Sequence, residues 1–302
     1  TNTLVLFNYV EKHGKPLFKL IQEKLPKERK DLCYYISGEI KVEERERIRG
    51  LLDEKRISLY FGDEKIILDA AKFLETGQKT ELNYNVKNTD RTIGSKLSSY
   101  IYNKFKDTQI NDDQITLNLN GSAGQSLGAF AVRGLTIKVH GDANDYVGKS
   151  LSGGKIVIRP DKNSKIKSNE NTIMGNTCMY GATSGSLYAS GKAGERFAVR
   201  NSGATTVVEG CGSNGCEYMT GGNVIILGKT GDNFGAGMTG GMAFVYDLDK
   251  KFKYRVNDET LVFASIQSNY WKNVLKELII KHYNETNSSH AKKIIDNWEV
   301  EY

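Results

Sequence analysis

The sequence predicts a mainly β protein, a β-solenoid with helical segments on both sides, and three observations predict it. The glycines are concentrated, since 25 of the 31 lie between Gly121 and Gly241. Apolar runs follow glycines at steps of 19, 32, 18, 18 and 19 residues, counted between Gly134, Gly153, Gly185, Gly203, Gly221 and Gly240. Helical repeats need roughly 33 residues or more, so this period favours stacked strands.

The strands are expected where β-favouring residues follow the glycines. These runs are Leu135–Val139, Ile156–Ile158, Leu187–Ala189, Thr205–Val208, Val224–Leu227 and Ala243–Tyr246. The one long step contains the polar stretch Arg159–Asn171, which we interpret as a loop inserted into the repeat. Glycine adopts positive φ without steric cost, which suits corners between strands. The predicted corners are Gly134, Gly153, Gly154, Gly185, Gly203, Gly221, Gly222, Gly240 and Gly241.

Helical patterns flank the glycine-rich region and are expected to cap it. Asp69–Gly77 is predicted as a short helix ended by Gly77, and Gly94–Phe105 as a second one with Leu97 and Ile101 on one face. A C-terminal helix carries the stripe Trp271, Val274, Leu275, Leu278 and His282, and Ala291–Trp298 continues helically. The expected organisation is a helical N-terminal segment (1–61), a helical or extended lead-in (62–114), the solenoid (115–250) and a helical cap (251–302).

The stretch Gly235–Gly240 contains a literal G-x-G-x-x-G, the spacing of a dinucleotide-binding loop. That motif needs a helix after the glycines, whereas the apolar run Met242–Tyr246 predicts a strand. Related glycine-ended segments occur at Gly148–Gly154 and Gly215–Gly222 without the pyrophosphate spacing. We therefore interpret the motif as one copy of the structural repeat.

Composition excludes several classes of function. The net charge is +6, but lysines alternate with acids and no aromatic side chains interleave with a basic run, so nucleic-acid binding is not expected. No apolar run reaches the length of a membrane span and no signal peptide is evident, which predicts a soluble, cytoplasmic protein. Neither the cysteines nor the histidines show metal-site spacing. They are Cys33, Cys178, Cys211, Cys216, His13, His140, His282 and His290.

Several ordered motifs resemble a known family. They are Asn88–Arg91, Gly121–Phe130, Gly141–Gly154, Ala193–Gly203, Gly215–Gly222 and Gly228–Gly231, with Arg255–Asn257 and Asn297–Trp298 towards the end. Together they are similar to the C-terminal GXGXG domain of the glutamate synthase large (alpha) subunit. The resemblance runs from about Gly62 to the C-terminus.

This resemblance implies a right-handed parallel β-helix that serves as a scaffold. Glutamate synthases hydrolyse glutamine at an N-terminal cysteine, pass ammonia through a tunnel, and aminate 2-oxoglutarate at FMN beside a [3Fe-4S] cluster. None of those sites lies in the resembled domain, so no catalytic, cofactor-binding or metal-binding residue is expected on this chain. The expected partners are the amidotransferase and FMN/iron–sulfur domains or subunits, and a homo-oligomer is left open.

Polar and charged residues in the resembling motifs are candidates for docking these partners: Asn88, Asp90, Arg91, Glu195, Arg196 and Arg200. An internal salt-bridge network at the corners would explain the same charges. Two other functions stay open. One is the scaffold of a formylmethanofuran-dehydrogenase-like redox complex, whose β-helix subunit has a related glycine pattern. The other is a stand-alone β-helix enzyme or binding protein using paired carboxylates among Asp142, Asp145, Glu195, Glu209, Glu217 and Asp232.

Overall fold

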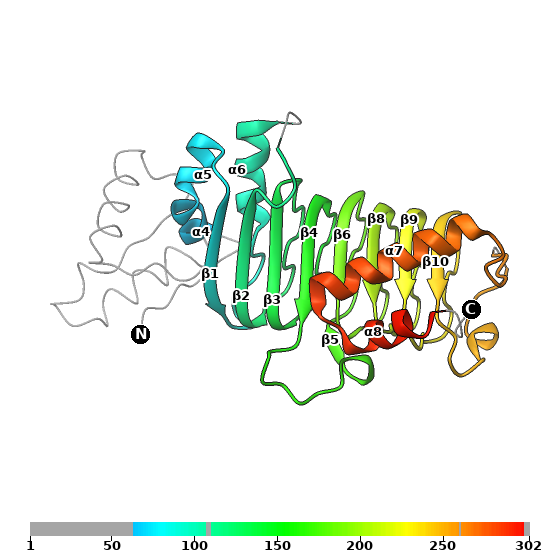
Figure 1. The fold of residues 1–302 in the computed structure, drawn as a ribbon. Helices are drawn as coiled ribbons and strands as arrows, with labels where there is room; N and C mark the ends of the chain where they lie inside the picture. The colour runs from blue at the N-terminus through cyan, green and yellow to red at the C-terminus, as the bar shows by residue number, and fades with distance from the viewer. Residues whose placement is uncertain (1–62, 107–109, 260, 299–302) are drawn as a thin grey trace, which may run out of the picture. The chain divides into compact units, whose positions relative to one another are not determined.

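A ten-stranded parallel β-sheet dominates the computed structural model, which describes residues 63–106, 110–259 and 261–298. Eight strands lie side by side in chain order, with their connections returning behind them (Figure 1). They are β1 (Thr80–Val86), β2 (Ile115–Ala123), β3 (Leu135–Ala143), β4 (Ser152–Arg159), β6 (Ser184–Ala189), β8 (Ser202–Val208), β9 (Thr220–Ile226) and β10 (Gly240–Val245). The short β5 (Thr172–Met174) and β7 (Lys192–Ala193) pair with each other, and β5 also pairs with β3.

The expected strands are found where the glycine steps place them. All six β-favouring runs fall in strands, with Leu227 and Tyr246 one residue beyond the ends of β9 and β10. Most of Arg159–Asn171 is an exposed loop between β4 and β5, followed by the 3-10 turn Ser168–Glu170. The sheet also begins earlier than expected, because β1 lies in the segment assigned as a lead-in. The predicted helical segment 1–61 lies outside the described residues.

The predicted helices are also present. Two short helices, α4 (Asp63–Asp69) and α5 (Ala71–Thr76), precede β1, and α5 ends at Gly77 with a φ of 70°. Next, α6 (Ser95–Phe105) begins after Gly94 and buries Leu97 and Ile101. At the C-terminus lie α7 (Asn269–Thr286) and α8 (Ser289–Asp296).

One face of the sheet is buried in every repeat and is apolar except at Thr206. Its central row runs through Leu117, Ile137, Ile156, Leu187, Thr206 and Val224, which pair strand to strand and are fully buried. Connecting segments pack against this row, since a Cβ added at Gly128 would lie 2.6 Å from Ile156. The inward side chains therefore form a continuous core along the stack.

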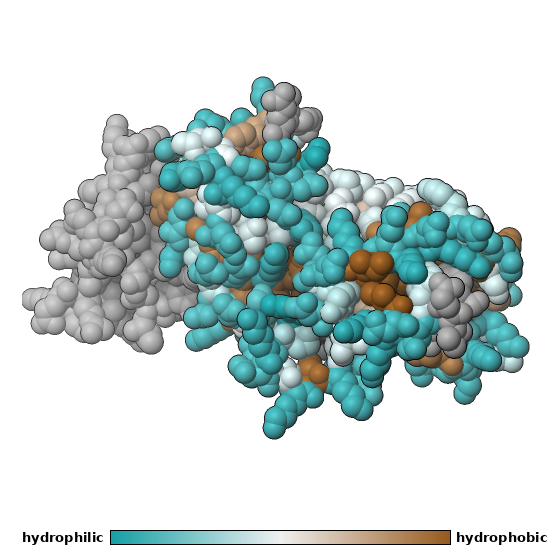
Figure 2. Space-filling model, viewed as in Figure 1, coloured by the Kyte–Doolittle hydropathy of each residue, from teal (hydrophilic) through white to brown (hydrophobic). Residues whose placement is uncertain are grey.

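The opposite face changes character part-way across the sheet. Its central row begins with Asn118 and Lys138 and continues with Val157, Tyr188, Val207, Ile225 and Phe244. The apolar part packs against Leu275 and Ile279 of α7 and against α8, whereas the polar part has no helix over it. Figure 2 shows mainly hydrophilic side chains on this side, with hydrophobic surface gathered between α7 and α8. The C-terminal helices thus explain why strands after β3 lose the apolar–polar alternation.

The segments that follow the strands share one unusual backbone conformation. We call them the arcs, residues 125–130, 145–150, 176–181, 195–200, 213–218 and 232–237. In every arc the second, fourth and sixth residues have φ between 53° and 76°. Of these 18 positions, 13 hold a residue other than glycine, although a left-handed conformation costs such a residue about 1–2 kcal/mol.

Hydrogen bonds between arcs account for this conformation. In the arc 145–150, Tyr146 N–H donates to Asn176 O of the following arc (2.9 Å), and Gly148 N–H donates to Leu127 O of the preceding one (2.9 Å). Ser150 N–H donates forwards again, to Tyr180 O (2.8 Å). Alternate left-handed residues therefore direct N–H groups to both neighbours, and each buried donor finds a partner.

Glycine is present for one of two reasons, a left-handed φ or the close approach of a neighbouring backbone, and substitutions should distinguish them. Gly181 has φ +62°, and a Cβ there would meet only Ser150 Oγ at 3.8 Å; equivalent arc positions hold Ser150, Arg200 and Tyr218. At Gly203, whose φ is not positive, a Cβ would overlap the carbonyl oxygen of Thr183. We expect Gly181→Ala to cost about 1 kcal/mol of unfolding free energy and Gly203→Ala distinctly more, because two strands must separate. Urea unfolding of the 302-residue chain measures both, and equal costs would contradict this explanation.

Candidate functional site

The outer surface of the arcs carries exposed aromatic and arginine side chains. They stand at the left-handed positions and comprise Phe130, Tyr146, Arg196, Arg200 and Tyr218, a set that we call the arc ridge. Phe130 is 55% exposed and Tyr218 is 52% exposed, with the Arg200 guanidinium 5.8 Å from the Tyr218 ring centroid. Tyrosine and arginine supply much of the binding energy in protein interfaces. Sequence reasoning found the two arginines but missed the aromatics, because nothing local marks a left-handed residue.

The first group of predicted docking residues belongs to the turn after β1. Asn88 and Arg91 are exposed, whereas Asp90 is only 7% exposed. The Asp90 carboxylate accepts a hydrogen bond from Lys87 N–H (2.8 Å), and its backbone carbonyl accepts one from Gly124 N–H (3.0 Å). Asp90 therefore shapes the turn, and only Asn88 and Arg91 are available to a partner.

The second group lies on the arc 195–200. Glu195, Arg196 and Arg200 are exposed, and Arg196 forms an ion pair of 3.3 Å with Glu217 of the following arc. This contact is the kind of salt bridge between corners that would explain the charges without docking. Arg91 and Glu195 lie on the same edge, but four repeats separate them, which is about 19 Å at the spacing of β-strands. The structure does not bring the two groups together.

The predicted glycine corners lie at the starts of strands, in two conformations. Positive φ occurs at Gly134, Gly153, Gly185, Gly222 and Gly241. The others, Gly154, Gly203, Gly221 and Gly240, do not have positive φ, and a side chain there would press on the neighbouring repeat. Close approach of backbones, rather than a left-handed turn, is the constraint at these four positions.

Three of the acids considered for paired-carboxylate chemistry are each held by a different partner. Asp142 accepts a hydrogen bond from Ser122, Asp145 accepts one from Asn176 N–H, and Glu217 pairs with Arg196. Among the residues described, no group of three or more His, Cys, Asp or Glu side chains could hold a metal ion. Burial raises the pKa of the Cys178 and Cys211 thiols to about 12, so both are protonated and weakly nucleophilic at neutral pH.

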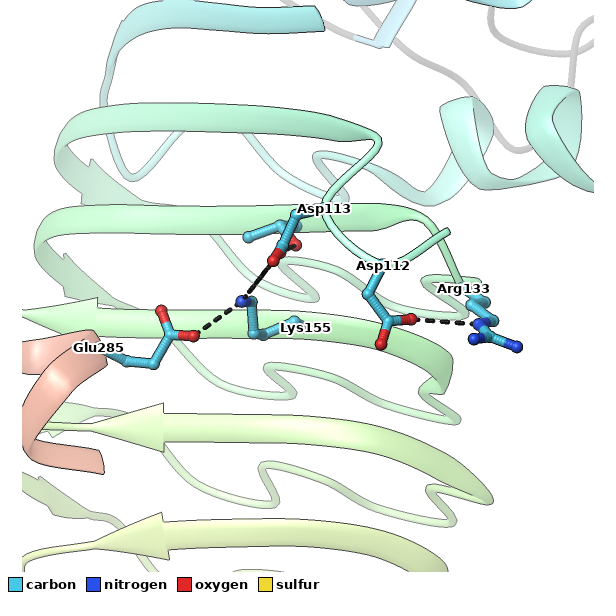
Figure 3. Close-up of polar contacts among 6 residues, drawn as sticks. Asp112, Asp113, Arg133, Lys155 and Glu285 are labelled. Atoms are coloured by element: carbon cyan, nitrogen blue, oxygen red, sulfur yellow. Dashed lines mark hydrogen bonds and ion pairs between the residues drawn. The ribbon is translucent and has the colours of Figure 1, made fainter. Parts of the chain in front are cut away.

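An ion-pair network joins the C-terminal helix to the sheet at the point where the outer face changes from polar to apolar. Figure 3 shows Lys155 of β4 between Asp113, which precedes β2, and Glu285 near the end of α7. Lys155 Nζ lies 2.8 Å from Asp113 Oδ1 and 2.7 Å from Glu285 Oε1. Burial would lower the pKa of Lys155, but the hydrogen bonds that it donates to both carboxylates outweigh this and raise the pKa above its ordinary value. Lys155 is therefore a charged link between three segments distant in the sequence.

A second polar contact holds α7 and α8 over β8. Glu209 follows β8 and is 1% exposed; its Oε1 accepts hydrogen bonds from Ser190 and Ser288 and lies 3.6 Å from His282 Nε2. Burial raises the pKa of Glu209, but the nearby His282, Ser168 and Ser288 side chains more than offset this and hold it below its usual range. Ser288 also caps α8 by accepting a hydrogen bond from Ala291 N–H (2.9 Å). The buried carboxylate thus fixes the start of the last helix.

Comparison with known proteins decides the family. The GXGXG motif family matches residues 63–302, most of the chain. The chain belongs to this family. Over 239 residues the GXGXG domain is 56% identical to the glutamate synthase (NADPH) large chain of Azospirillum brasilense, which covers 79% of this chain and 16% of that relative.

Other glutamate synthases are also similar to the GXGXG domain. It is 48% identical over 236 residues to the glutamate synthase (NADH) of Schizosaccharomyces pombe, covering 78% of this chain and 11% of that protein. Ferredoxin-dependent glutamate synthase 2 of Synechocystis sp. is 46% identical over 232 residues, covering 77% of this chain and 15% of the relative. The chain therefore spans about a sixth or less of the relatives it matches.

Removal of the Lys155 ammonium should loosen the attachment of α7 to the sheet. Lys155→Met keeps the apolar stem but leaves the half-buried Asp113 and Glu285 without their cation. We expect a loss of about 1–3 kcal/mol in unfolding free energy, between the values for exposed and buried pairs. Arg133→Met is the matched control, because it breaks the exposed Arg133–Asp112 pair and should cost under about 0.5 kcal/mol. Similar losses in the two variants by urea unfolding would refute the linking role.

Glu209 should make the stability of the GXGXG domain depend on acid pH. Because its folded-state pKa is lowered, its contribution is present above the unfolded-state pKa and is lost as the pH falls through the folded-state value. Glu209→Gln should cost about 1–3 kcal/mol at neutral pH and flatten the acid limb of the stability profile. The exposed Asp142→Asn is the control and should leave that limb unchanged. The readout is denaturant unfolding across an acid pH series, and an unaltered limb in Glu209→Gln would exclude this role.

Proposed function

We propose that this chain is the non-catalytic scaffold of a glutamate synthase. On this proposal it spaces the amidotransferase and FMN/iron–sulfur parts of the enzyme and helps to enclose the path of ammonia between them. The observation that carries the proposal is 56% identity over 239 residues to a segment that makes up only 16% of a glutamate synthase large chain. A domain that forms so small a share of a multi-step enzyme works through its neighbours.

We further propose that the ten-stranded sheet and the arcs form a right-handed parallel β-helix. The strands follow one another in chain order, all pairs are parallel, and the arcs hydrogen-bond to both neighbouring arcs. Eight stacked strands extend over roughly 34 Å at the spacing of β-strands. A hydrogen-bonded stack of this length is stiff, which suits a spacer between domains that must stay in fixed positions.

The chemistry of the buried groups is compatible with a structural role. The Cys178 and Cys211 thiols are held protonated, and the buried Glu209 carboxylate is occupied in positioning α8. FMN and the [3Fe-4S] cluster would then be held by other parts of the synthase. None of the helices in the described ranges is long and apolar enough to cross a membrane, and a cytoplasmic location remains part of the proposal.

The arc ridge is the surface that we propose for docking these parts. The backbone that carries its aromatic and guanidinium groups is already held by hydrogen bonds between arcs, so little backbone entropy is lost on binding. Exposed Asn88 and Arg91 extend the same edge towards the N-terminal repeats. The Arg196–Glu217 ion pair would orient the ridge rather than contribute strongly to affinity.

Affinity isolation from native cells tests the proposal. The tagged 302-residue chain should recover an amidotransferase and a flavin protein, with flavin absorbance in the eluate, or should occur within a longer polypeptide that contains them. Recovery of neither would reject the scaffold role. Measurable glutaminase or synthase turnover by the purified chain alone would also reject it.

Charge reversal on the ridge should weaken docking without unfolding the chain. Arg200→Glu replaces an exposed guanidinium beside Tyr218 with a carboxylate. We expect recovery of partners to fall about tenfold or more, the effect of losing an interface hot spot. Arg133→Glu, an exposed arginine outside the ridge, is the control and should leave recovery near that of the unaltered chain. Equal recovery by both variants, with unchanged thermal unfolding, would place docking elsewhere.

A further inference from the structure

Basic side chains gather on the outer face of the sheet, where the inserted loop leaves β4. We call this group the basic corner; it comprises Lys138 and His140 of β3, Arg159 at the end of β4, and Lys162 and Lys165 of the loop. His140 and Arg159 pair in register, so they lie on the same face of neighbouring strands, about 5 Å apart. Lys138 precedes His140 by two residues and therefore lies on that face too.

The cations of the basic corner are unpaired. None of them forms an ion pair with another residue in the described ranges: Lys138, Arg159, Lys162 and Lys165. Two acids lie close by, and each already accepts a hydrogen bond. Asp142 accepts one from Ser122, and Asp161 accepts one from Asn163 N–H (2.8 Å). The basic corner thus holds four cations against two carboxylates that are partly occupied.

The pKa of His140 reflects these positive surroundings. Burial is the largest cause that lowers it, and Arg159 and Lys162 are the next largest. Asp161 acts in the opposite direction but does not offset them. Because Lys138 and Arg159 are only partly exposed, water screens their charges less than those of fully exposed lysines. A carboxylate brought to this face is therefore attracted more strongly than at an ordinary surface position.

Two amides extend the row that contains His140 and Arg159. Asn120 of β2 pairs in register with His140, and Asn85 of β1 pairs with Asn120. Both amides are exposed, and neither has a hydrogen-bond partner in its side chain's reach among the residues described. The four strands span about 14 Å, the length of about four residues of extended chain. No described helix covers this part of the face (Figure 1).

We propose that the basic corner and its row of amides bind an extended acidic segment of a partner protein. Carboxylates of the segment pair with Arg159 and Lys138, and its peptide groups hydrogen-bond to the amides of Asn85 and Asn120. The inserted loop, which the repeat itself does not need, supplies further lysines at one side. Single-stranded nucleic acid is disfavoured, because no Phe, Tyr or Trp on this face of β1–β4 offers a stacking platform. The inference concerns a surface other than the arc ridge and does not depend on the scaffold role.

Fluorescence anisotropy with a defined probe tests this surface. The probe is a fluorescein-labelled peptide of about ten glutamates, which is long enough to cover the row, and it is titrated with the 302-residue chain. We expect saturable binding that weakens as the salt concentration rises, because the contact depends on charge. Absence of binding at low salt would overturn the proposal. Tighter binding of a labelled oligothymidylate of equal length would also overturn it.

Charge-reversal variants locate the contact. Arg159→Glu and Lys138→Glu should each weaken binding of the glutamate peptide about tenfold or more, because each replaces an attraction with a repulsion. The matched control is Lys104→Glu, which makes the same change in net charge at an exposed lysine of α6 and should alter the affinity less than about twofold. Thermal unfolding confirms that the variants are folded. Equal weakening in all three would indicate unspecific attraction to a basic protein and refute the site.

An uncharged variant tests the row of amides. Asn120→Ala leaves every charge in place and should weaken binding about fivefold, the value of one hydrogen bond. Asn103→Ala, which removes an exposed amide of α6, is the control and should leave the affinity unchanged. Unchanged affinity in Asn120→Ala would reject an extended segment lying along the row.

Discussion

Alternation of left-handed residues in the arcs is the constraint on which the rest of the structure depends. Each of the four inner arcs directs backbone N–H groups to the arc before it and the arc after it, so neighbouring repeats can stack only in one register. The conformation is unfavourable for residues such as Thr177 and Arg196, and it persists because hydrogen bonds on both sides hold it. Stacking of the arcs and pairing of the strands are consequently one cooperative feature.

Because the register between strands is fixed, equivalent side chains of successive repeats form rows. The buried row at Leu117 and Ile137 continues through every repeat, while the outer row changes from Asn118 and Lys138 to Val157 and Tyr188. The change marks where α7 begins to cover the sheet, and Lys155 lies there with carboxylates on both sides. The helices are thus positioned by apolar contact along most of their length and by charge at one end.

The candidate surfaces follow from the same geometry. Left-handed residues at the sixth arc position lie at the surface, which gathers Phe130, Arg200 and Tyr218 on one ridge. The register between strands gathers Asn120, His140 and Arg159 in one row on the outer face. Neither feature is local in the chain, because each combines one residue from every repeat that contributes to it.

The sequence by itself determined six of the strands (β3, β4, β6, β8, β9 and β10), the inserted loop, the helices α6 and α7, and the family, because each depends on local periodicity or on ordered motifs. The predicted docking arginines Arg196 and Arg200 were also recognisable as exposed charges. The tertiary structure alone decided which arc residues are left-handed, that Asp90 is buried, and that Lys155 meets Glu285 across 130 positions. It also decided that Gly203 and Gly221 are required by a neighbouring backbone. These features depend on contacts with residues of the neighbouring repeat. The spacing of residues along the sequence does not reveal such contacts.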